Sequence, residues 1–446
     1  MKNIFIIGAG RSAPTMIKYL LEESRKSDWS IKVGDISLEL AQERVGNHDH
    51  GTAIQFDVTN NEQRQKEIGA ADVVVSMLPP SMHMEVARDC VTLGKHMVTA
   101  SYVSEEMKAL HDEAASKGIV LLNEIGLDPG LDHLSSMEII EKIKEKGGTL
   151  TSFESFTGGL IAPESDNNPW NYKFTWNPRN VVLAGQGVVK FIQEGKYKYI
   201  PYHQVFNRIE KININNYGAF EGYANRDSLK YREVYGLQDI PTLYRGTLRR
   251  PGFCRAWDLF VQLGATDDSY TMEHTETMTH REFINSFVFY HPGDSVKLKV
   301  AYHMGIGIES DELEKLEWLG MFSNSVVGLK NASPAQILQH ILEKKWALDP
   351  DDKDMIVMMH RVFYTINGVK KKLTSELVVK GDDSTYTAMA KTVGLPLAIA
   401  TKHIVNGIIN TPGVVLPITK EIYEPTLKEL SLRGIEFMEH DVEVEG

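Results

Sequence analysis

The first 35 residues carry the pattern that most restricts how this chain can fold. An apolar strand-like run, Ile4–Ile7, leads directly into Gly8-Ala-Gly10-Arg-Ser-Ala13, and a second strand-like run, Ser30–Asp35, ends in a carboxylate. The first glycine permits a tight turn, the second lets the main chain approach a pyrophosphate, and the alanine lets the next helix pack closely. That helix would direct its free N–H groups at the phosphates. The pattern predicts a dinucleotide-binding fold.

The position of Asp35 bears on which dinucleotide is bound. An acid about 20 residues after the glycines can accept hydrogen bonds from an adenosine ribose, and its charge would repel a 2′-phosphate. An acid at the end of a strand can also be a solvated loop charge. We expect the ribose role, which favours NAD and leaves NADP as the alternative.

Apolar strands and amphipathic helices alternate as far as residue 128. Further strands are expected at Thr52–Asp57, Ala71–Leu78, His96–Ala100 and Ile119–Asn123, with helices at Leu38–Val45, Met82–Leu93 and Ser104–Ser116. With right-handed crossovers this alternation predicts a Rossmann-type, doubly wound parallel sheet in an α/β protein.

Ligands of such sheets lie beyond the carboxyl ends of the strands. The Leu78-Pro-Pro80 segment fits a turn that stops a helix as well as it fits a ligand contact. The residues at these strand ends are the candidate cofactor contacts: Gly8, Gly10, Arg11, Ser12, Ala13, Asp35, Asp57, Val58, Leu78, Ala100, Ser101, Gly126, Leu127 and Asp128.

From residue 129 the pattern becomes mixed. A helix is expected at Asp132–Lys146, where Asp132 is better placed than Asp128 to be the N-cap. Strands are expected at Leu150–Thr157, Phe283–Tyr290 and Val296–Met304, a helix at Ser333–Ala347, a strand pair at Lys353–Asn367 and Lys370–Val379, and apolar helical stretches at Thr385–Ala390 and Gly394–Gly407. A mixed α+β domain of this kind commonly supplies substrate contacts and a subunit interface.

Composition excludes several classes of partner. The chain has 446 residues and a formal net charge of -12, which disfavours nucleic-acid binding. Cys90 and Cys254 are the two cysteines of the sequence, which argues against a disulfide scaffold and suits a reducing compartment. No apolar run reaches 18 residues and the histidines show no metal spacing. We expect a cytoplasmic, membrane-free protein without a catalytic metal.

Several polar side chains could carry chemistry. Ser101 and Tyr102 follow the fifth strand, and Asp128 follows the sixth within Gly126-Leu-Asp-Pro-Gly130. Arg226 and Arg249 stand out because a planar guanidinium binds a carboxylate with two hydrogen bonds. Taken singly, a tyrosine is a buried core residue about as often as it is a substrate contact. A single arginine is more often a surface charge than a ligand-binding group. These residues predict a nicotinamide oxidoreductase with a small carboxylated substrate.

At the same residues the sequence resembles the glutamate-forming saccharopine dehydrogenases, also called saccharopine reductases. The likeness covers nearly the whole chain. It includes His96–Ser104, Gly126–His133, Ser155–Glu164, Asn168–Trp176, Tyr223–Ser228, Arg245–Arg249 and Ala388–Pro396. The resemblance implies three parts: a dinucleotide-binding domain at 1–128, a substrate-binding and dimerisation domain with a helical insertion at 129–384, and a C-terminal segment at 385–446 that returns to the first domain.

The resemblance also implies the activity: reversible NAD(P)-dependent oxidation of saccharopine to 2-aminoadipate 6-semialdehyde and glutamate, in lysine metabolism. Asp128 and Tyr102 would move protons, with Lys173 as another candidate, and a homodimer is expected. The substrate contacts would be Ser101, Tyr102, Asp128, Arg226, Thr247, Leu248 and Arg249. Fungal members have an arginine-containing turn after the second strand, suited to NADP, where this chain has Val33-Gly-Asp-Ile-Ser37.

Three alternatives remain open on the sequence. Carboxynorspermidine dehydrogenase and lysine dehydrogenase act on related amines with fewer carboxylates, and so need fewer arginine clamps. A non-catalytic NAD(H)-binding redox sensor would not need a second, polar substrate site.

Overall fold

The computed structural model describes residues 1–444, which form two compact units. Unit 1 comprises residues 1–150, 364–371 and 377 onward, and unit 2 comprises residues 151–363 and 372–376. The functional domain limits at 128 and 384 stay a prediction. No helix in residues 1–444 is both long and apolar enough to cross a bilayer.

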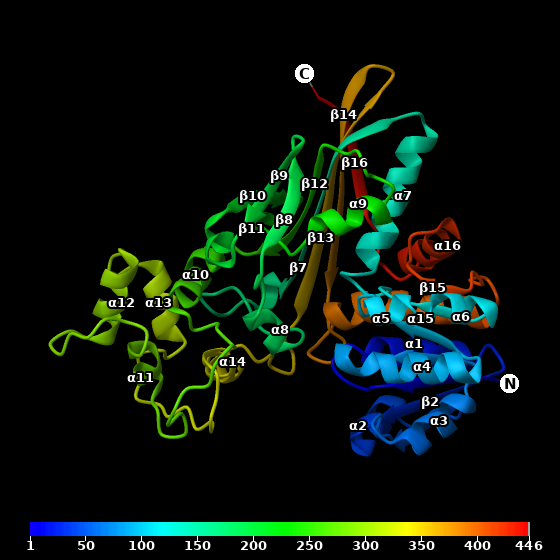
Figure 1. Ribbon diagram of the computed structural model, residues 1–446, viewed down its shortest axis with the longest axis horizontal. Coiled ribbons are helices and arrows are strands. Elements are labelled where there is room, and N and C mark those ends of the chain that lie inside the picture. The colour runs from blue at the N-terminus through cyan, green and yellow to red at the C-terminus, as the bar shows by residue number, and fades with distance from the viewer. Residues whose placement is uncertain (445–446) are drawn as a thin grey trace. The chain divides into compact units, whose positions relative to one another are not determined.

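Unit 1, whose N-terminal part runs from blue to cyan in Figure 1, is built on a parallel seven-stranded sheet in the order β15-β6-β5-β4-β1-β2-β3. Its strands are β1 (Lys2–Ile7), β2 (Trp29–Asp35), β3 (Gly51–Gln55), β4 (Val73–Ser76), β5 (His96–Thr99), β6 (Val120–Leu122) and β15 (Gly413–Val415). Strand β1 lies inside the sheet between β2 and β4, where Ile4 pairs with Ile31 on one side and with Val73 on the other. The order reverses next to β1, which places the topological switch point beside the glycine-rich turn. The doubly wound parallel sheet is confirmed.

The helices of unit 1 connect these strands. They are α1 (Pro14–Ser24), α2 (Leu38–Val45), α3 (Asn61–Gly69), η1 (Pro80–Met82), α4 (His83–Leu93), α5 (Glu105–Lys108), α6 (His111–Ser116), α7 (Leu131–Glu145), α15 (Ala388–Val405) and α16 (Lys420–Ser431). Strand alternation sends Phe5 and Ile7 of β1 into one apolar cluster with Val86 and Ala87 of α4. This cluster is the core on one face of the sheet.

The C-terminal part of the chain returns to the dinucleotide fold. Helix α15 lies against α1, and a Cβ on Gly394 would come within 3.1 Å of the Met16 main-chain nitrogen. A glycine is required there because the two helix backbones approach so closely. Lys402 of α15 donates to Glu23 of α1 and to Glu429 of α16, each at 3.0 Å. Three helices far apart in sequence are therefore joined by one ion-pair network.

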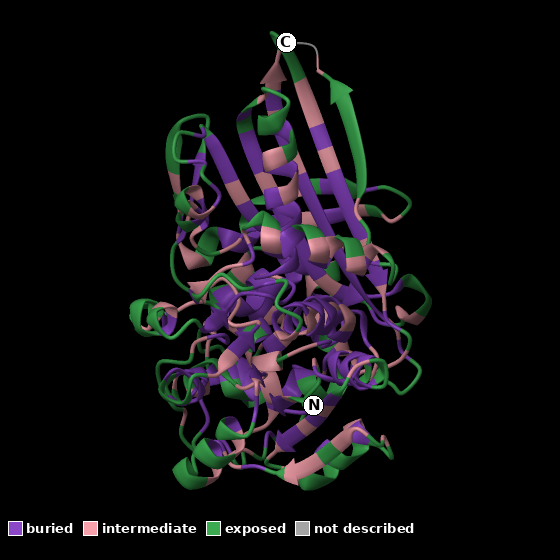
Figure 2. Cartoon of the chain, turned by 90° about the vertical axis from the view of Figure 1, so that its right-hand side faces the viewer, coloured by how far each residue is buried: buried purple, intermediate pink, exposed green. Residues whose placement is uncertain are grey.

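The second sheet follows the order β10-β11-β12-β7-β13-β14-β16, with β8 paired to β12 and β9. Its strands are β7 (Thr149–Ile161), β8 (Val189–Gln193), β9 (Lys196–Ile200), β10 (Ile209–Ile214), β11 (Gly218–Ala224), β12 (Thr242–Arg249), β13 (Asp354–Ile366), β14 (Val369–Lys380) and β16 (Met438–Glu443). Asn367 and Gly368 both have positive φ between β13 and β14, as a two-residue hairpin turn requires. Edge strand β16 is exposed along its length, green in Figure 2.

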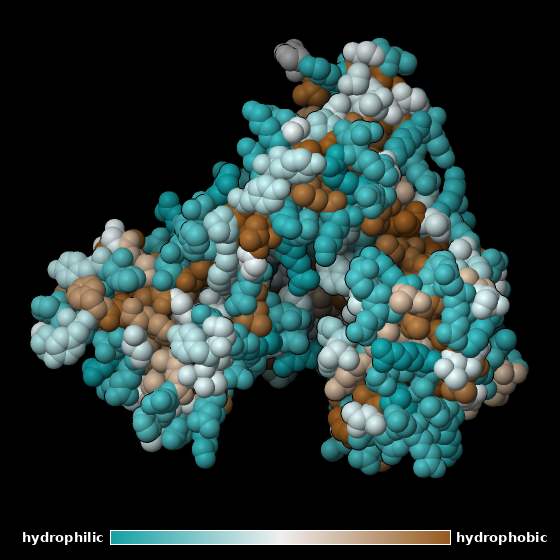
Figure 3. Space-filling view, in the orientation of Figure 1, coloured by the Kyte–Doolittle hydropathy of each residue, from teal (hydrophilic) through white to brown (hydrophobic). Residues whose placement is uncertain are grey.

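Unit 2 adds helices around an aromatic core. They are η2 (Pro163–Ser165), α8 (Pro178–Val182), η3 (Tyr202–Asn207), η4 (Ser228–Lys230), α9 (Tyr231–Val234), α10 (Phe253–Leu263), α11 (His280–Asn285), α12 (Val296–Met304), α13 (Asp311–Trp318) and α14 (Pro334–Lys345). Trp170, Trp257 and Trp346 are buried together in this core. On the face seen in Figure 3, hydrophobic side chains show among hydrophilic ones over α12 and α13.

Two expected strands are absent from the structure, which corrects the sequence prediction: the first is part helix and part turn, and the second is a helix. The segment Phe283–Tyr290 begins within α11, where Thr279 and Glu282 form a capping box, and Val296–Met304 is α12. In α12 the Ser295 side chain accepts from the Leu298 N–H, and the buried residues Val296 and Val300 follow helical spacing. Short runs rich in β-branched residues fit both the strand pattern and the helix pattern, and here the capping side chains favour the helix.

Three smaller differences concern unit 1. The sequence prediction missed β15, which has three residues and follows a Thr-Pro turn. The helix expected at Ser104–Ser116 is divided into α5 and α6. Asp132 is not the N-cap of α7, because Gly130 occupies that position and donates its N–H to the Asp132 carboxylate at 2.6 Å.

Other predictions are confirmed. The structure contains the expected strand pair, β13 and β14, and the expected helix α14 with its Ser333 cap.

Candidate functional site

The glycine-rich turn has the geometry that a dinucleotide phosphate needs. Gly8 has φ +105°, and a Cβ there would lie 2.9 Å from the Met77 carbonyl oxygen. A Cβ on Gly10 would meet nothing within 4 Å, so this main chain has an open side. Ala13 is buried beneath the start of α1, and its N–H donates to Gly10 O at 3.0 Å. Arg11 lies exposed and Ser12 half-buried in the same turn. The residues present therefore fit a pyrophosphate at the N-terminus of α1.

Asp35 closes β2 beside this turn. Its carboxylate accepts from the Ala9 N–H at 2.8 Å and from the Ser37 N–H at 2.9 Å. Each oxygen keeps a further lone pair, so the side chain can also accept hydroxyl donors. The sequence prediction placed Asp35 at this strand end but did not include its bond to the turn.

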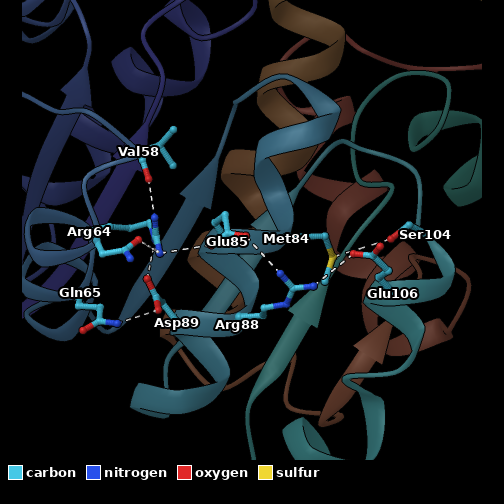
Figure 4. A network of polar contacts seen from close by, with 10 residues as sticks. Val58, Arg64, Gln65, Met84, Glu85, Arg88, Asp89, Ser104 and Glu106 are labelled. Atoms are coloured by element: carbon cyan, nitrogen blue, oxygen red, sulfur yellow. Dashed lines mark hydrogen bonds and ion pairs between the residues drawn. The ribbon is translucent and has the colours of Figure 1, made fainter.

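The loop after β3 contains Asp57 and Val58, and a buried arginine stabilises this loop. Arg64 donates to the Val58 carbonyl at 2.6 Å and to the Asp89 carboxylate of α4 at 2.6 Å (Figure 4). The side chain of Arg64 is 4% exposed. Asp57 accepts from the Thr59 hydroxyl and N–H, which lowers the pKa of its carboxyl. Sequence reasoning missed Arg64, whose position on α3 looks like that of an ordinary surface charge.

The turn after β4 includes Leu78, which is half-buried. At the end of β4, Ser76 Oγ lies 2.8 Å from Nδ1 of His83, the first residue of α4. Burial lowers the pKa of His83 to about 4, so its imidazole is neutral near pH 7. The Ser76 and His83 side chains therefore join the end of β4 to the start of α4 without introducing a charge.

The ends of β5 and β6 bring the proposed acid–base residues together. Tyr102 is 37% exposed, and its hydroxyl lies 3.4 Å from Oδ1 of Asp128. Gly126 fits closely, because a Cβ there would lie 2.8 Å from the Ala100 Cβ. Ala100, Ser101 and Asp128 are half-buried, whereas Leu127 is 6% exposed. A phenol and a carboxylate at the carboxyl edge of the sheet can bind and transfer protons.

A buried carboxylate that the sequence prediction did not single out lies behind these residues. Glu124 follows β6, is 7% exposed and has φ +56°. Its Oε1 accepts from the Val103 N–H at 2.9 Å, and its Oε2 lies 2.8 Å from Nε2 of His133, which is fully buried on α7. The sequence signal was limited to an acid two residues before the Gly126-Leu-Asp128 motif.

In unit 2, β12 carries the expected substrate residues Thr247, Leu248 and Arg249. Arg249 is 4% exposed, and its Nη1 donates to the Leu248 carbonyl at 3.0 Å. Its guanidinium carbon lies 5.2 Å from the ring centroid of Tyr172 and 5.3 Å from that of Phe253. Arg249 Nε is buried without a hydrogen-bond partner, and no carboxylate within residues 1–444 pairs with this side chain.

A buried arginine without a counter-ion is unusual, because the desolvation of a cation is normally offset by a paired anion. Arg249 can therefore offer a desolvated guanidinium to an anionic group. Leu248 is fully buried, so its side chain is a core residue. Thr247 is half-buried. Arg226 is exposed in the turn after β11 and has φ +49°.

Lys173 is not suited to act as a base. Its Nζ lies 2.6 Å from an Asp352 oxygen and 3.1 Å from an Asp349 oxygen. Burial opposes the charge, but hydrogen bonds to these two carboxylates outweigh it and raise the pKa of Lys173. Its ammonium therefore stays protonated near pH 7. Within residues 1–444, no three His, Cys, Asp or Glu side chains gather as a metal site would require.

Comparison with known proteins identifies the family of both parts. The family described as saccharopine dehydrogenase NADP binding domain matches residues 4–122, and saccharopine dehydrogenase C-terminal domain matches residues 126–435. Together these matches include nearly all of the residues discussed above.

Curated relatives extend over the same length. The chain is 32% identical to saccharopine dehydrogenase [NADP(+), L-glutamate-forming] of Schizosaccharomyces pombe, with 100% of both chains covered. It is 35% identical to the mitochondrial alpha-aminoadipic semialdehyde synthase of Rattus norvegicus over 98% of this chain and 47% of that protein. The chain thus spans about half the length of the synthases that it matches.

Solved structures agree. Apo saccharopine dehydrogenase (L-Glu forming) from Saccharomyces cerevisiae is 31% identical, with a TM-score of 0.90 over 99% of this chain and 100% of that chain. Homospermidine synthase from Legionella pneumophila shares the fold, with 12% identity and a TM-score of 0.54 over 99% of this chain and 91% of that chain. On the two domain matches and the full-length fungal relatives, the chain belongs to the saccharopine dehydrogenase family.

Proposed function

We propose that this protein is a glutamate-forming saccharopine dehydrogenase, an NAD(P)-dependent oxidoreductase that acts on a CH–NH group in lysine metabolism. The observation that carries the proposal is Arg249, a buried guanidinium without a carboxylate partner in a chain of this family. Saccharopine bears three carboxylates, and Arg249 gives one of them a preformed, desolvated binding group. The names of the full-length fungal relatives support the same substrate.

The dinucleotide would be held by Gly8–Ala13 at the phosphates, Asp35 and Asp57–Val58 at the adenosine, and Leu78, Ala100, Ser101 and Gly126–Asp128 towards the nicotinamide. The chemistry that a bound dinucleotide supplies is acceptance of a hydride. The open side of Gly10 supports the phosphate position, since a side chain there would fill it. The N-terminus of α1 adds main-chain donors and a positive dipole end.

We propose that Asp35 favours NAD over NADP. Its carboxylate would accept the ribose hydroxyls and repel a 2′-phosphate. The names of the fungal relatives specify NADP(+), and the matched domain family is described as NADP binding. The NAD preference is therefore the part of the proposal that a cofactor comparison decides, with NADP as its alternative.

Asp128 and Tyr102 are the proposed acid–base residues. Loss of a hydride from the carbon beside the secondary amine and of the N–H proton leaves an imine. Water then adds to the imine carbon, the C–N bond breaks, and glutamate leaves with its nitrogen protonated. Asp128 can accept the proton of the attacking water, and Tyr102, 3.4 Å from Asp128, can return a proton to nitrogen. The overall reaction consumes one water and releases one proton.

Arg226, Thr247 and Arg249 are the proposed contacts to the carboxylates of saccharopine, together with Ser101. Because the side chain of Leu248 is buried, this residue would contribute through its main chain. Loss of one charge-assisted bond costs about 1.5–3 kcal/mol. Arg226→Ala should therefore raise the KM for saccharopine by about tenfold or more. An equal rise in the dinucleotide KM would remove Arg226 from the substrate site.

The test of the function is a matrix of saccharopine, lysine and carboxynorspermidine with NAD and NADP, followed by the absorbance of reduced nicotinamide. Turnover of saccharopine is the expected result. Turnover of carboxynorspermidine or lysine alone would assign one of the related amine dehydrogenases. Dinucleotide binding without turnover of any of these amines would favour a redox sensor.

A homodimer and a cytoplasmic location complete the proposal. Cys90 and Cys254 are buried free thiols, as suits a reducing compartment. Sedimentation equilibrium would test the dimer, since a monomer at micromolar concentration contradicts it. Imaging of the tagged full chain in its own cells would test the location.

A further inference from the structure

Glu124 is a buried carboxylate with no role in the proposed reaction. Taking a carboxylate out of water is costly unless its oxygens are hydrogen-bonded, and both oxygens of Glu124 have partners. Oε1 accepts from the Val103 N–H at 2.9 Å, and Oε2 lies 2.8 Å from His133 Nε2. Its φ of +56° is uncommon for a residue with a side chain, so surrounding contacts must hold it there.

Those contacts join Glu124 to both sides of Tyr102. The Glu124 N–H donates to the Ser101 carbonyl at 3.1 Å, while its side chain accepts from the Val103 N–H at 2.9 Å. One residue thus binds the main chain immediately before and immediately after Tyr102. Tyr102 is 37% exposed, so the position of its ring depends in part on the main chain at its two sides.

His133 fixes the other oxygen of Glu124. It is fully buried on α7, a 15-residue helix that begins directly after the Gly126–Gly130 turn that contains Asp128. The Glu124–His133 contact therefore connects the Tyr102 loop to the helix that follows the Asp128 turn. The hydroxyl of Tyr102 lies 3.4 Å from Asp128, which is longer than a strong hydrogen bond. A small shift of either loop would separate the two groups.

We infer that Glu124 and His133 are positioning residues that hold Tyr102 against Asp128 for proton transfer. The inference rests on the proposed function, in which Tyr102 and Asp128 exchange protons with the substrate. Neither Glu124 nor His133 has to touch substrate or dinucleotide. A misplacement of about 1 Å at a reacting group can cost about 100-fold in rate, so the position of this loop should matter to kcat.

The test is a double-mutant cycle with Tyr102→Phe and Glu124→Leu. Glu124→Leu should lower kcat by about 30- to 100-fold and change the dinucleotide KM by less than about 2-fold. Glu124→Gln, which can still accept from Val103 N–H, should recover at least about one fifth of the wild-type kcat. In the Tyr102→Phe background, Glu124→Leu should lower kcat by less than about 3-fold, because the group it positions is already absent.

The matched control is Glu138→Leu. Glu138 is a carboxylate on the same helix as His133, pairs with Lys142 at 3.2 Å and is 34% exposed. This variant should keep the wild-type kcat. Additive effects in the cycle, or an equal loss of dinucleotide affinity in Glu124→Leu, would overturn the inference, because both would mean that Glu124 supports unit 1 as a whole.

A second measurement separates this inference from the proposed function. Hydrogen exchange of residues 99–104 should be at least about tenfold faster in Glu124→Leu than in wild type, with β1 and β4 unchanged. If the wild type does not oxidise saccharopine, the proposed function fails and hydrogen exchange alone decides whether Glu124 holds the Tyr102 loop. Unchanged exchange at residues 99–104, or faster exchange throughout unit 1, would refute the positioning role.

Discussion

The carboxylate of Asp35 accepts a hydrogen bond from the main-chain N–H of Ala9, 2.8 Å away, so the end of β2 is tied directly to the glycine-rich turn. Asp35 therefore has two separable features to test: its oxygen accepts from the turn, and its charge is the proposed determinant of cofactor choice at the ribose. A substitution that keeps the acceptor and removes the charge can distinguish them.

Asp35→Asn is that substitution. The amide oxygen can still accept from Ala9 N–H, while the repulsion of a 2′-phosphate is lost. We expect the ratio of kcat/KM with NAD to kcat/KM with NADP to fall by about tenfold in Asp35→Asn. Asp35→Ala should lower the same ratio and should also weaken the binding of both cofactors. Steady-state kinetics with both dinucleotides measures this ratio. A wild type that prefers NADP would contradict the NAD assignment, and an unchanged ratio would contradict the charge argument.

Replacement of Arg249 should weaken substrate binding strongly and change stability little. Arg249→Met removes a buried cation that has no counter-ion and keeps most of the side-chain volume. We expect the saccharopine KM to rise by about 100-fold, while the free energy of unfolding falls by less than about 1 kcal/mol or rises. Substrate kinetics and denaturant unfolding of the same samples test both statements. A loss of about 3 kcal/mol or more would mean that Arg249 is a structural residue.

The dinucleotide half of the chain was predictable because its signals are local. Gly8 and Gly10 lie two residues apart, and the alternation of strand and helix repeats through residue 128. The end of α11 and the whole of α12 were predicted as strands, because a run such as Val296–Met304 is short and rich in residues that strands also favour. Its Ser295 cap decides the outcome, and a cap is easily missed in sequence.

Only part of the candidate site could be predicted from the sequence, because the remaining residues are brought together by contacts between distant positions. Residue type and family resemblance pointed to Asp128, Tyr102 and Arg249. The contact between Glu124 and Val103 joins residues 21 positions apart, and the contact between Arg64 and Asp89 joins residues 25 apart. The local sequence around each residue does not predict such distant pairs. The missing counter-ion of Arg249 is likewise a property of the folded core alone.

The Arg64–Asp89 pair should be a large stabilising element of unit 1. Breaking a buried pair leaves an uncompensated charge, so Arg64→Met should lower the free energy of unfolding by about 3–5 kcal/mol. The dinucleotide KM should rise as well, because the Val58 carbonyl loses its donor. Adding Asp89→Leu to Arg64→Met should restore part of the stability. Thermal unfolding and dinucleotide titration measure the two effects.

Figure 4 also contains the matched control. Arg88 lies on the same helix as Asp89, is 52% exposed and pairs with Glu85 at 3.2 Å and with Glu106 at 3.3 Å. Exposed pairs of this kind contribute about 0–1 kcal/mol, so Arg88→Met should leave unfolding almost unchanged. Equal destabilisation by Arg64→Met and Arg88→Met would show that burial is not the cause.

His83 should make the stability of unit 1 depend on pH. Burial lowers its pKa from about 6.5 to about 4, so between these values the unfolded chain binds the proton and the folded chain does not. Stability is therefore highest above about pH 6.5 and falls as the pH drops towards 4, by about 3 kcal/mol at most. His83→Asn can still offer an acceptor to Ser76 Oγ and cannot titrate in this window. The variant should lose less stability than wild type between pH 7 and pH 5, measured by urea unfolding. Equal slopes in wild type and His83→Asn would show that His83 is protonated within the folded protein at no cost.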